Sequence, residues 1–93
     1  MKKQRFELGL LVATPGALEV LGQLEVFPSE LLERHASGNW GAVSAEDARE
    51  NELSVREGFR IVSSYPLGEE GRKVWVITES DRSSTCILLP EEY

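Results

Sequence analysis

The spacing of apolar residues changes at Gly58, and this change constrains the fold more than any other feature of the sequence. After Gly58 apolar and polar residues alternate, which is the period of a half-buried β-strand. Three segments rich in Val, Ile, Tyr, Trp and Thr follow this alternation, at residues 59–65, 73–79 and 84–89. The links between them are short and polar, as in β-hairpins. The sequence therefore predicts a C-terminal three-stranded antiparallel β-meander.

One further strand candidate, residues 6–13, lies near the N-terminus. Its apolar residues alternate with others, so we expect these four on one face of the strand: Phe6, Leu8, Leu10 and Val12. A basic stretch, residues 1–5, precedes this strand and contains Lys2, Lys3 and Arg5. Because chain ends fray, we interpret residues 1–5 as a flexible, solvated tail.

Three helix starts lie between the first strand and Gly58, at Thr14, Ser29 and Ser44. Each carries a hydroxyl that can accept a hydrogen bond from the first turn of a helix. Gly38 and Gly58 suit the ends of the second and third helices, because glycine readily adopts the left-handed backbone of a helix C-terminus. The third helix is highly charged, and we expect it to be exposed, with a narrow apolar side packed on the sheet. These signals together predict an α+β fold: an N-terminal strand, two or three short helices and the C-terminal meander.

Length and charge limit the functions open to this chain. Its 93 residues suit a single domain, residues 1–93, and leave no room for a second core. The 10 basic residues stand against 16 acidic ones, for a net charge of −6, which disfavours nucleic-acid binding because that depends on neutralising phosphates. No apolar stretch is long enough for a signal peptide or a membrane-spanning helix, so we expect a cytoplasmic protein without membrane contact.

The sequence lacks the residues that a metal or cofactor site would need. The single cysteine, Cys86, lies in an apolar run and is interpreted as a small buried thiol. His35, the only histidine, could act as a general base near neutral pH, but its helical spacing with Leu31 favours a packed, hydrogen-bonded ring. A zinc site needs three or four ligands, and the sequence has no phosphate loop, dinucleotide fingerprint or calcium loop. We therefore expect no metal and no cofactor.

The densest cluster of functional groups lies at the predicted tip of the last hairpin, residues 78–85. Binding candidates in it are Glu79, Asp81, Arg82 and Thr85. A guanidinium presents a planar fork to a carboxylate or phosphate, so this turn could hold a polar ligand. The alternative is turn chemistry alone, in which Asp and Ser close the turn and the arginine pairs with a neighbouring acid. Trp40 is a further binding candidate, as an aromatic platform instead of a core residue.

Several short motifs are familiar as a set: Ala13–Glu19, Arg34–His35, Gly38–Gly41, Trp75–Glu79, Asp81–Ser83 and Leu88–Tyr93. In this order they resemble the pattern of a family of small uncharacterised bacterial proteins, and the resemblance spans nearly the whole chain. The resemblance implies that the gene lies near plasmid, phage or other mobile genes, and it implies no particular activity. One departure is Asn39, where the pattern leads us to expect Asp, which argues against a required carboxylate at that position.

Three functions compete on the sequence alone. The leading hypothesis is a non-enzymatic interaction or regulatory module that binds a protein or a small polar ligand, because no catalytic constellation is visible in so small a domain. The second is a small ribonuclease-like enzyme or toxin. In that enzyme His35 or Glu79 would be the base, and Arg60 or Arg82 would stabilise the pentavalent phosphate. The third is an acidic mimic of nucleic acid, which the net charge of −6 permits.

Overall fold

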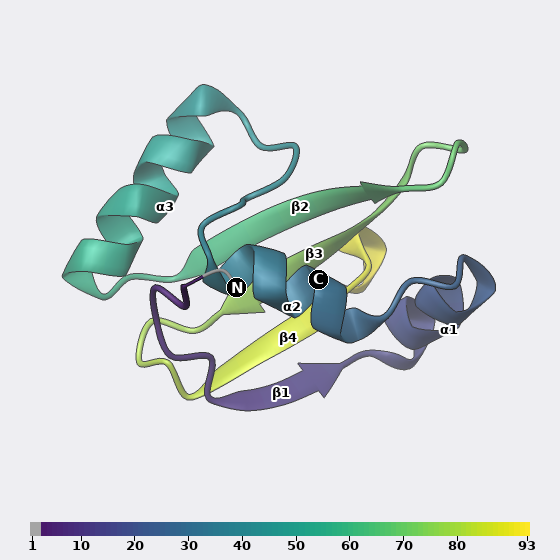
Figure 1. Cartoon of the computed structure of the whole chain (residues 1–93), viewed down its shortest axis with the longest axis horizontal. Helices are drawn as coiled ribbons and strands as arrows, with labels where there is room; N and C mark the ends of the chain where they lie inside the picture. Colours follow the sequence, from purple (N-terminus) through teal and green to yellow (C-terminus); the bar gives the residue numbers. More distant parts are fainter. Residues whose placement is uncertain (1–2) are drawn as a thin grey trace.

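The computed structural model describes residues 3–93 and has the predicted α+β class. A four-stranded mixed sheet has the strand order β1-β4-β3-β2 (Figure 1). Its strands are β1 (Leu10–Ala13), β2 (Ile61–Leu67), β3 (Arg72–Thr78) and β4 (Ser84–Leu88). The helices are α1 (Pro15–Gln23), α2 (Pro28–Ala36), α3 (Ala45–Glu57) and the short 3-10 helix η1 (Pro90–Glu92).

The C-terminal meander predicted from the alternating pattern is confirmed. β2 pairs antiparallel with β3, and β3 pairs antiparallel with β4. The first hairpin turn is shorter than the sequence indicates, because Pro66 and Leu67 still belong to β2. Pro66 is tolerated because β2 is an edge strand, where a missing N–H need not break a bond inside the sheet. On the other side of β4, the N-terminal strand β1 joins the sheet in parallel.

Side-chain caps begin two of the helices as predicted. Thr14 Oγ1 accepts a backbone N–H of the first turn of α1 at 3.1 Å, and Ser44 Oγ does the same for α3 at 3.0 Å. Gly58 ends α3 with a left-handed φ of 82°. The predicted start of α2 is wrong: Phe27 is its N-cap, and Ser29 lies inside its first turn after a proline that needs no N–H partner. No helix within residues 3–93 is long and apolar enough to cross a membrane.

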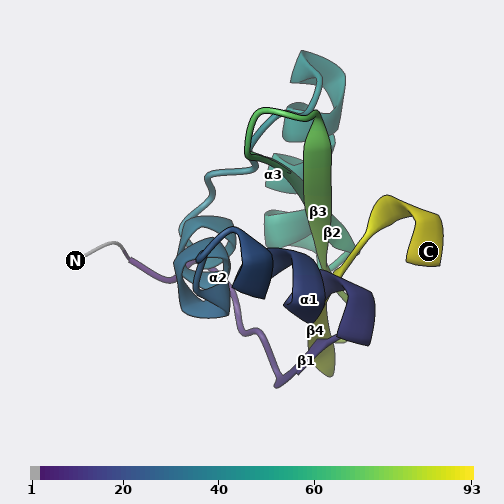
Figure 2. The same cartoon turned by 90° about the vertical axis from the view of Figure 1, so that its right-hand side faces the viewer.

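The two faces of the sheet differ in what covers them. Helices α1 and α2 lie against one face, the covered face, whereas η1 lies against the opposite, open face (Figure 2). The main core fills the space between α1, α2 and the covered face, and its fully buried members are Ala17, Val20, Leu21, Leu31, Tyr65, Leu67, Val74, Val76 and Ile87. A second, smaller cluster consists of Phe6, Trp40 and Ile61. Strand alternation places Trp75, between two core valines, on the open face.

The predicted N-terminal strand is shorter than residues 6–13, and the prediction of one shared face is wrong. Phe6 is 8% exposed in the smaller cluster, whereas Leu10 is 68% exposed on β1. Gly9 separates them with a left-handed φ of 67°, which interrupts the alternation. A Cβ atom at Gly9 would collide with the backbone carbonyl of Arg82, so the chain needs glycine at this crossing.

Part of the predicted flexible tail, residues 1–5, is anchored to the domain. Residues 1–2 lie outside the described residues. The backbone N–H of Arg5 donates to the carbonyl of Ala36 at 2.8 Å, and its guanidinium pairs with Glu52 of α3 at 2.8 Å. This ion pair raises the pKa of Arg5 and lowers that of Glu52. The tail interpretation therefore does not hold for Arg5.

Helix α3 lies along the β2 edge of the sheet (Figure 1). The predicted apolar packing is confirmed in part, because Ala48 and Val55 pack against the smaller cluster. However, the most buried residues of α3 are polar, and one of them, Asn51, fixes the helix to the strand. Its side chain donates to the Val62 carbonyl at 2.8 Å and accepts the Val62 N–H at 3.2 Å. A side-chain amide thus replaces a missing neighbouring strand.

Candidate ligand-binding cleft

His35, a predicted candidate for a general base, is completely buried between α2 and the covered face. Its Nδ1 is 2.6 Å from Ser63 Oγ, and its Nε2 is 2.9 Å from Thr78 Oγ1. The line continues from Thr78 to Thr85 over 2.7 Å, and from Thr85 to the carbonyl of Leu8 over 2.7 Å. A single line of hydrogen bonds therefore crosses β2, β3 and β4 and ends on the N-terminal segment.

The proton positions along this line follow from the Leu8 carbonyl, which can only accept. Thr85 donates to that carbonyl and Thr78 donates to Thr85, so Thr78 accepts the Nε2–H of His35. In a neutral ring with this tautomer, Nδ1 accepts from Ser63. Burial lowers the pKa of His35 to about 4, in agreement with a neutral ring. Both ring nitrogens are thus occupied in the core, without contact with solvent.

The guanidinium of Arg82 joins three segments of the chain. It donates to the carbonyls of Ser54, at the end of α3, and of Phe59, before β2, both at 2.8 Å. It also donates to two carbonyls of its own turn, and it lies 5.7 Å from the centre of the Phe6 ring. Backbone carbonyls therefore bind Nη1 and Nη2 of the guanidinium that was predicted to bind a ligand or a neighbouring acid.

The other members of the predicted turn site are spread over the molecule. Asp81 is exposed and closes the turn by accepting the Ser83 N–H at 3.0 Å, and hydrogen bonds from Ser83 lower the pKa of Asp81. Thr85 is completely buried. Trp40 is 6% exposed, and its indole N–H donates to Glu52 at 3.2 Å. The structure therefore does not bring Trp40, Asp81 and Thr85 together around one cavity.

Arg60 and Glu79 are two predicted site residues that the structure does bring together. Arg60 Nη2 lies 3.5 Å from Glu79 Oε2, and both side chains are 45% exposed. Arg60 also donates to the hydroxyl of Tyr93, which raises the pKa of Arg60, and the Tyr93 ring meets Trp75 edge-on at 5.7 Å between centroids. Alternation places Trp75 on the open face, and its contact with Tyr93 places this group there too, opposite His35. Of the residues predicted for a ribonuclease-like site, Glu79 and Arg60 therefore come together, whereas His35 is buried on the other side of the sheet.

A cleft of about 470 Å³ opens between α3 and the open face of the sheet. The α3 wall carries the carboxylates of Asp47 and Glu50, and the sheet wall carries Arg60, Lys73 and the ring of Trp75. Within residues 3–93 no ion pair joins the two walls. The cleft therefore presents two carboxylates on the α3 side. On the sheet side it presents Lys73, the ring of Trp75, and Arg60, whose charge is already paired with Glu79.

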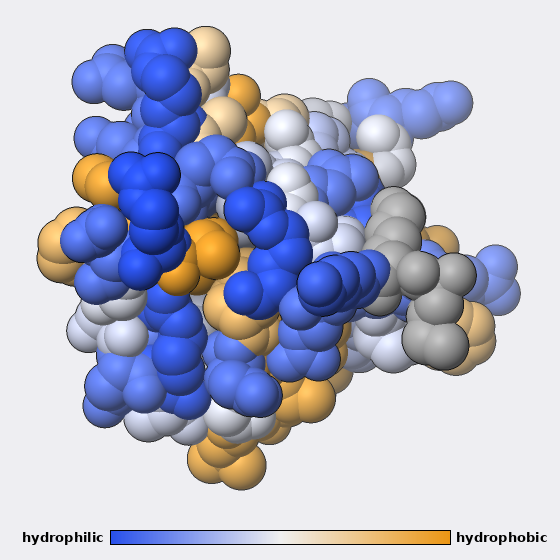
Figure 3. Space-filling model, turned by 60° about the vertical axis from the view of Figure 1, so that its left-hand side comes forward, coloured by the Kyte–Doolittle hydropathy of each residue, from blue (hydrophilic) through white to orange (hydrophobic). Residues whose placement is uncertain are grey.

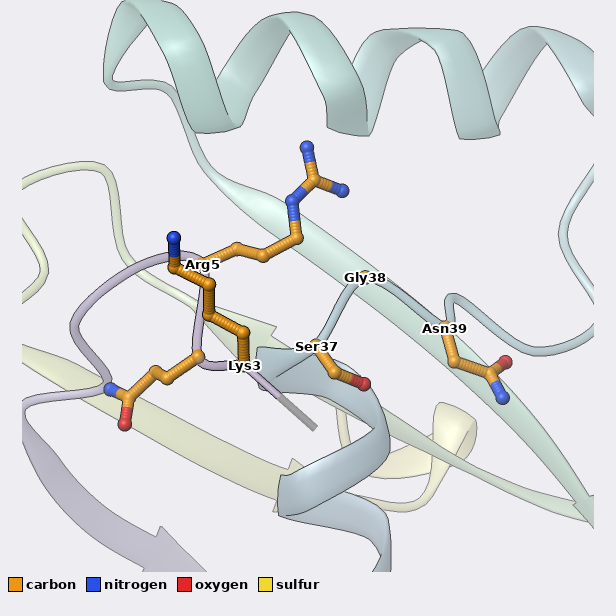
Figure 4. Close-up of a pocket in the computed structure, with 6 residues that line it drawn as sticks. Lys3, Arg5, Ser37, Gly38 and Asn39 are labelled. Carbon is orange, nitrogen blue, oxygen red and sulfur yellow. The ribbon is translucent and has the colours of Figure 1, made fainter. Parts of the chain in front are cut away.

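A second hollow, of about 680 Å³, lies between the N-terminal segment and the end of α2 (Figure 4). Its labelled residues include two cations, Lys3 and Arg5, but Figure 4 shows the Arg5 guanidinium pointing toward α3 and away from Ser37 and Asn39. This direction agrees with the ion pair to Glu52. The end of α2 also contributes the negative end of its helix dipole here, which offsets the remaining cation. The cleft beside α3 is therefore the better candidate site.

The side chains on the α3 side of the surface are mainly polar (Figure 3). Figure 3 shows that hydrophilic side chains cover most of the molecule on the α3 side, with hydrophobic groups in separate patches. The described part of the chain has no group of three His, Cys, Asp or Glu residues placed to hold a metal ion. Cys86 is half-buried, less than predicted, and burial raises the pKa of its thiol.

Sequence reasoning did not identify this cleft as a site. The alternation of β2 and β3 indicates which of their residues share the open face, and it places Lys73 and Trp75 together. The second wall exists because Asn51 of α3 binds the edge of β2, and this tertiary contact has no local sequence signal. No family model, no curated protein and no solved structure matches this chain.

Proposed function

We propose that this protein is a non-enzymatic interaction module that binds a charged segment of a partner protein in the cleft beside α3. The observation that carries the proposal is the division of charge, with Asp47 and Glu50 on one wall and Arg60 and Lys73 on the other. A segment with a basic side chain toward α3 and an acidic one toward the sheet would complement both walls. The half-buried ring of Trp75 would add apolar contact area.

The size of the cleft suits such a segment. A volume of about 470 Å³ lies in the range of sites that hold a ligand of a few side chains. Lys73 is exposed on the sheet wall, and it pairs with no acid among the described residues. A charged partner would therefore meet a cation that need not first release an internal ion pair.

The position of His35 also supports a binding role over catalysis. The residue is the only histidine of the chain, and both its nitrogens are hydrogen-bonded in the core. Glu79, the other predicted base, already pairs with Arg60. General acid–base catalysis needs a group within hydrogen-bond reach of the proton that it moves, and His35 has no exposed surface from which to reach a substrate.

A selection from a phage-displayed library of random peptides tests the proposal. The full chain is immobilised, and we expect enriched peptides to contain both a basic and an acidic residue. In isothermal titration calorimetry, Lys73→Glu and Glu50→Lys should each weaken binding of an enriched peptide by about tenfold. That loss corresponds to about 1.4 kcal/mol, near the contribution of one charge-assisted hydrogen bond.

Two matched controls separate the cleft from the surface in general. Arg72→Glu changes the neighbouring residue of β3, whose side chain points to the other face, and Glu46→Lys changes a residue of α3 that does not line the cleft. Both should bind as the unaltered chain does. A peptide whose acidic residue is replaced by lysine should regain affinity for Lys73→Glu. If no peptide is enriched, or if all four variants bind equally, the proposal is wrong.

A further inference from the structure

The two edges of the sheet differ in whether their outward backbone groups have hydrogen-bond partners. At the β2 edge they do. Asn51 pairs with both backbone groups of Val62. The Ser64 N–H donates to the Trp40 carbonyl at 3.0 Å, and the Ser64 carbonyl accepts the Ala42 N–H at 2.7 Å. Helix α3 and the loop before it therefore occupy the places that another strand would take. Such protection is the usual way in which proteins prevent edge-to-edge pairing.

The β1 edge has no such cover in the part of the chain that the structure describes. Leu10 and Thr14 direct their N–H groups to β4, at 3.0 Å from the carbonyls of Ser83 and Ile87. Because alternate residues of a strand face alternate neighbours, the N–H and C=O groups of Leu11 point away from the sheet. β1 is the terminal strand of the sheet order, so this row of groups faces outward.

The side chains of β1 are also unlike those of a protected edge. Leu10, Leu11 and Val12 are 68%, 52% and 41% exposed. The strand contains no proline and no charge, and the uncharged stretch continues from Leu8 to Leu18. Edge strands that stay single generally carry lysine, proline or a bulge. An apolar strand of this kind, with free backbone groups, is a template for pairing with another strand.

We propose that β1 is the interface for a second copy of this chain, which adds its own β1 antiparallel across a twofold axis. In the register centred on Leu11, the two Leu11 residues exchange both backbone hydrogen bonds, and Leu10 lies opposite the partner's Val12. Every cross-strand pair is then apolar, and the two sheets continue as one. An isologous contact of this kind closes on itself and does not extend into a filament.

In the twofold register β1 is complementary to itself, which favours a copy of the same chain as the occupant. Two molecules of net charge −6 repel each other, and this repulsion is weakest where the approaching surfaces are uncharged. The stretch from Leu8 to Leu18 meets this condition on both partners and places no like charges opposite each other. The same repulsion between the remaining surfaces should make the dimer stronger at high salt. This interface is independent of the proposed cleft, which lies at the β2 edge.

Sedimentation equilibrium of the full chain over a range of concentrations tests the interface. We expect the apparent mass to approach twice that of the monomer, with tighter association in 500 mM than in 50 mM salt, roughly as Debye screening predicts. Leu10→Lys should remain monomeric over the same range. Phe27→Lys is the matched control, because Phe27 is also 68% exposed but lies at the start of α2, and this variant should dimerise normally.

Hydrogen exchange distinguishes pairing through β1 from non-specific association. The Leu11 amide should exchange more slowly as the concentration rises, whereas the Leu10 amide, bonded to β4, should be protected at every concentration. Circular dichroism of Leu10→Lys checks that the variant is folded. A chain that stays monomeric at the highest concentration, a Leu10→Lys variant that dimerises, or pairing only with the strand of a different protein would overturn the proposal.

Discussion

The imidazole of His35 donates one hydrogen bond and accepts another inside the core, whereas a protonated ring would have to donate both. The Ser63 hydroxyl would then have to accept where it now donates. The water that stabilises an imidazolium in solution is also absent, since the ring is completely buried. These conditions favour the neutral ring, and the pKa of His35 accordingly lies at about 4.

We expect the free energy of unfolding to fall as the pH is lowered from 6.5 to 4. In the unfolded chain His35 titrates near 6.5, so between these values the unfolded state binds a proton that the folded state does not. The contribution of the neutral ring is complete above pH 6.5, and about 3 kcal/mol of it is lost by pH 4. Urea unfolding at a series of pH values measures this loss.

His35→Asn is the control for this pH dependence, because asparagine keeps a donor and an acceptor and does not titrate. Its unfolding free energy should stay level between pH 6.5 and 4.5. At lower pH both proteins should lose further stability, because hydrogen bonds lower the pKa of Glu52 and of Glu92 in the folded chain. The same slope in both proteins above pH 4.5 would show that His35 is not the titrating group.

Arg82 should affect stability through its contacts with distant carbonyls. Arg82→Ala removes the hydrogen bonds to Ser54 and Phe59 and should lower the free energy of unfolding by about 2 kcal/mol. Arg82→Gly loses the same bonds but relieves a left-handed backbone, with φ at 61°, so it should be less destabilised by about 1 kcal/mol. Chemical denaturation compares the two. Equal stability of the alanine and glycine variants would contradict the backbone contribution.

For His35 and Arg82, the sequence predicted the chemistry of the side chain better than it predicted the groups around it. The packed, hydrogen-bonded ring expected for His35 is confirmed, because its helical spacing with Leu31 places it on the buried side of α2. For Arg82 the acceptors are carbonyls of α3 and of the segment before β2, far away along the chain. A local pattern therefore identified a cation at a turn but not what it binds.

At the scale of the elements, predictions succeed where a side chain meets its own backbone. The caps at Thr14 and Ser44 and the stop at Gly58 are local hydrogen bonds or local dihedral angles, and all three are found as predicted. The N-terminal strand is different. Its alternation is interrupted at Gly9 by a close crossing with the turn at Arg82, and this crossing exists only in the folded chain.

Asn51→Ala should expose the edge of β2. The substitution leaves the N–H and C=O of Val62 without partners, so we expect a loss of about 1–3 kcal/mol in the free energy of unfolding. We also expect more aggregation, measured by light scattering, because an unprotected edge pairs with other chains. Leu53→Ala, on an exposed position of the same helix, should change neither quantity much. An Asn51→Ala variant as stable and soluble as the unaltered chain would contradict this role.

For the whole molecule, the α+β class and the meander could be predicted because each meander strand pairs with the next one along the chain. The parallel pairing of β1 with β4 and the position of α3 at the β2 edge join distant segments. Those two contacts determine which surfaces of the sheet remain accessible. They leave one face of the sheet open, form the cleft against it and make β1 the uncovered edge.

The most direct test of the proposed binding site uses the two tryptophans as reporters within one molecule. Trp75 lines the cleft, whereas the Trp40 indole N–H is bonded to Glu52 away from it. The ¹⁵N-labelled chain is titrated with the most strongly enriched peptide and followed by two-dimensional NMR. We predict that the Trp75 indole signal and the Ser64 amide shift with saturation, while the Trp40 indole signal stays in place. A peptide that binds and moves Trp40 but leaves Trp75 unchanged would contradict the account.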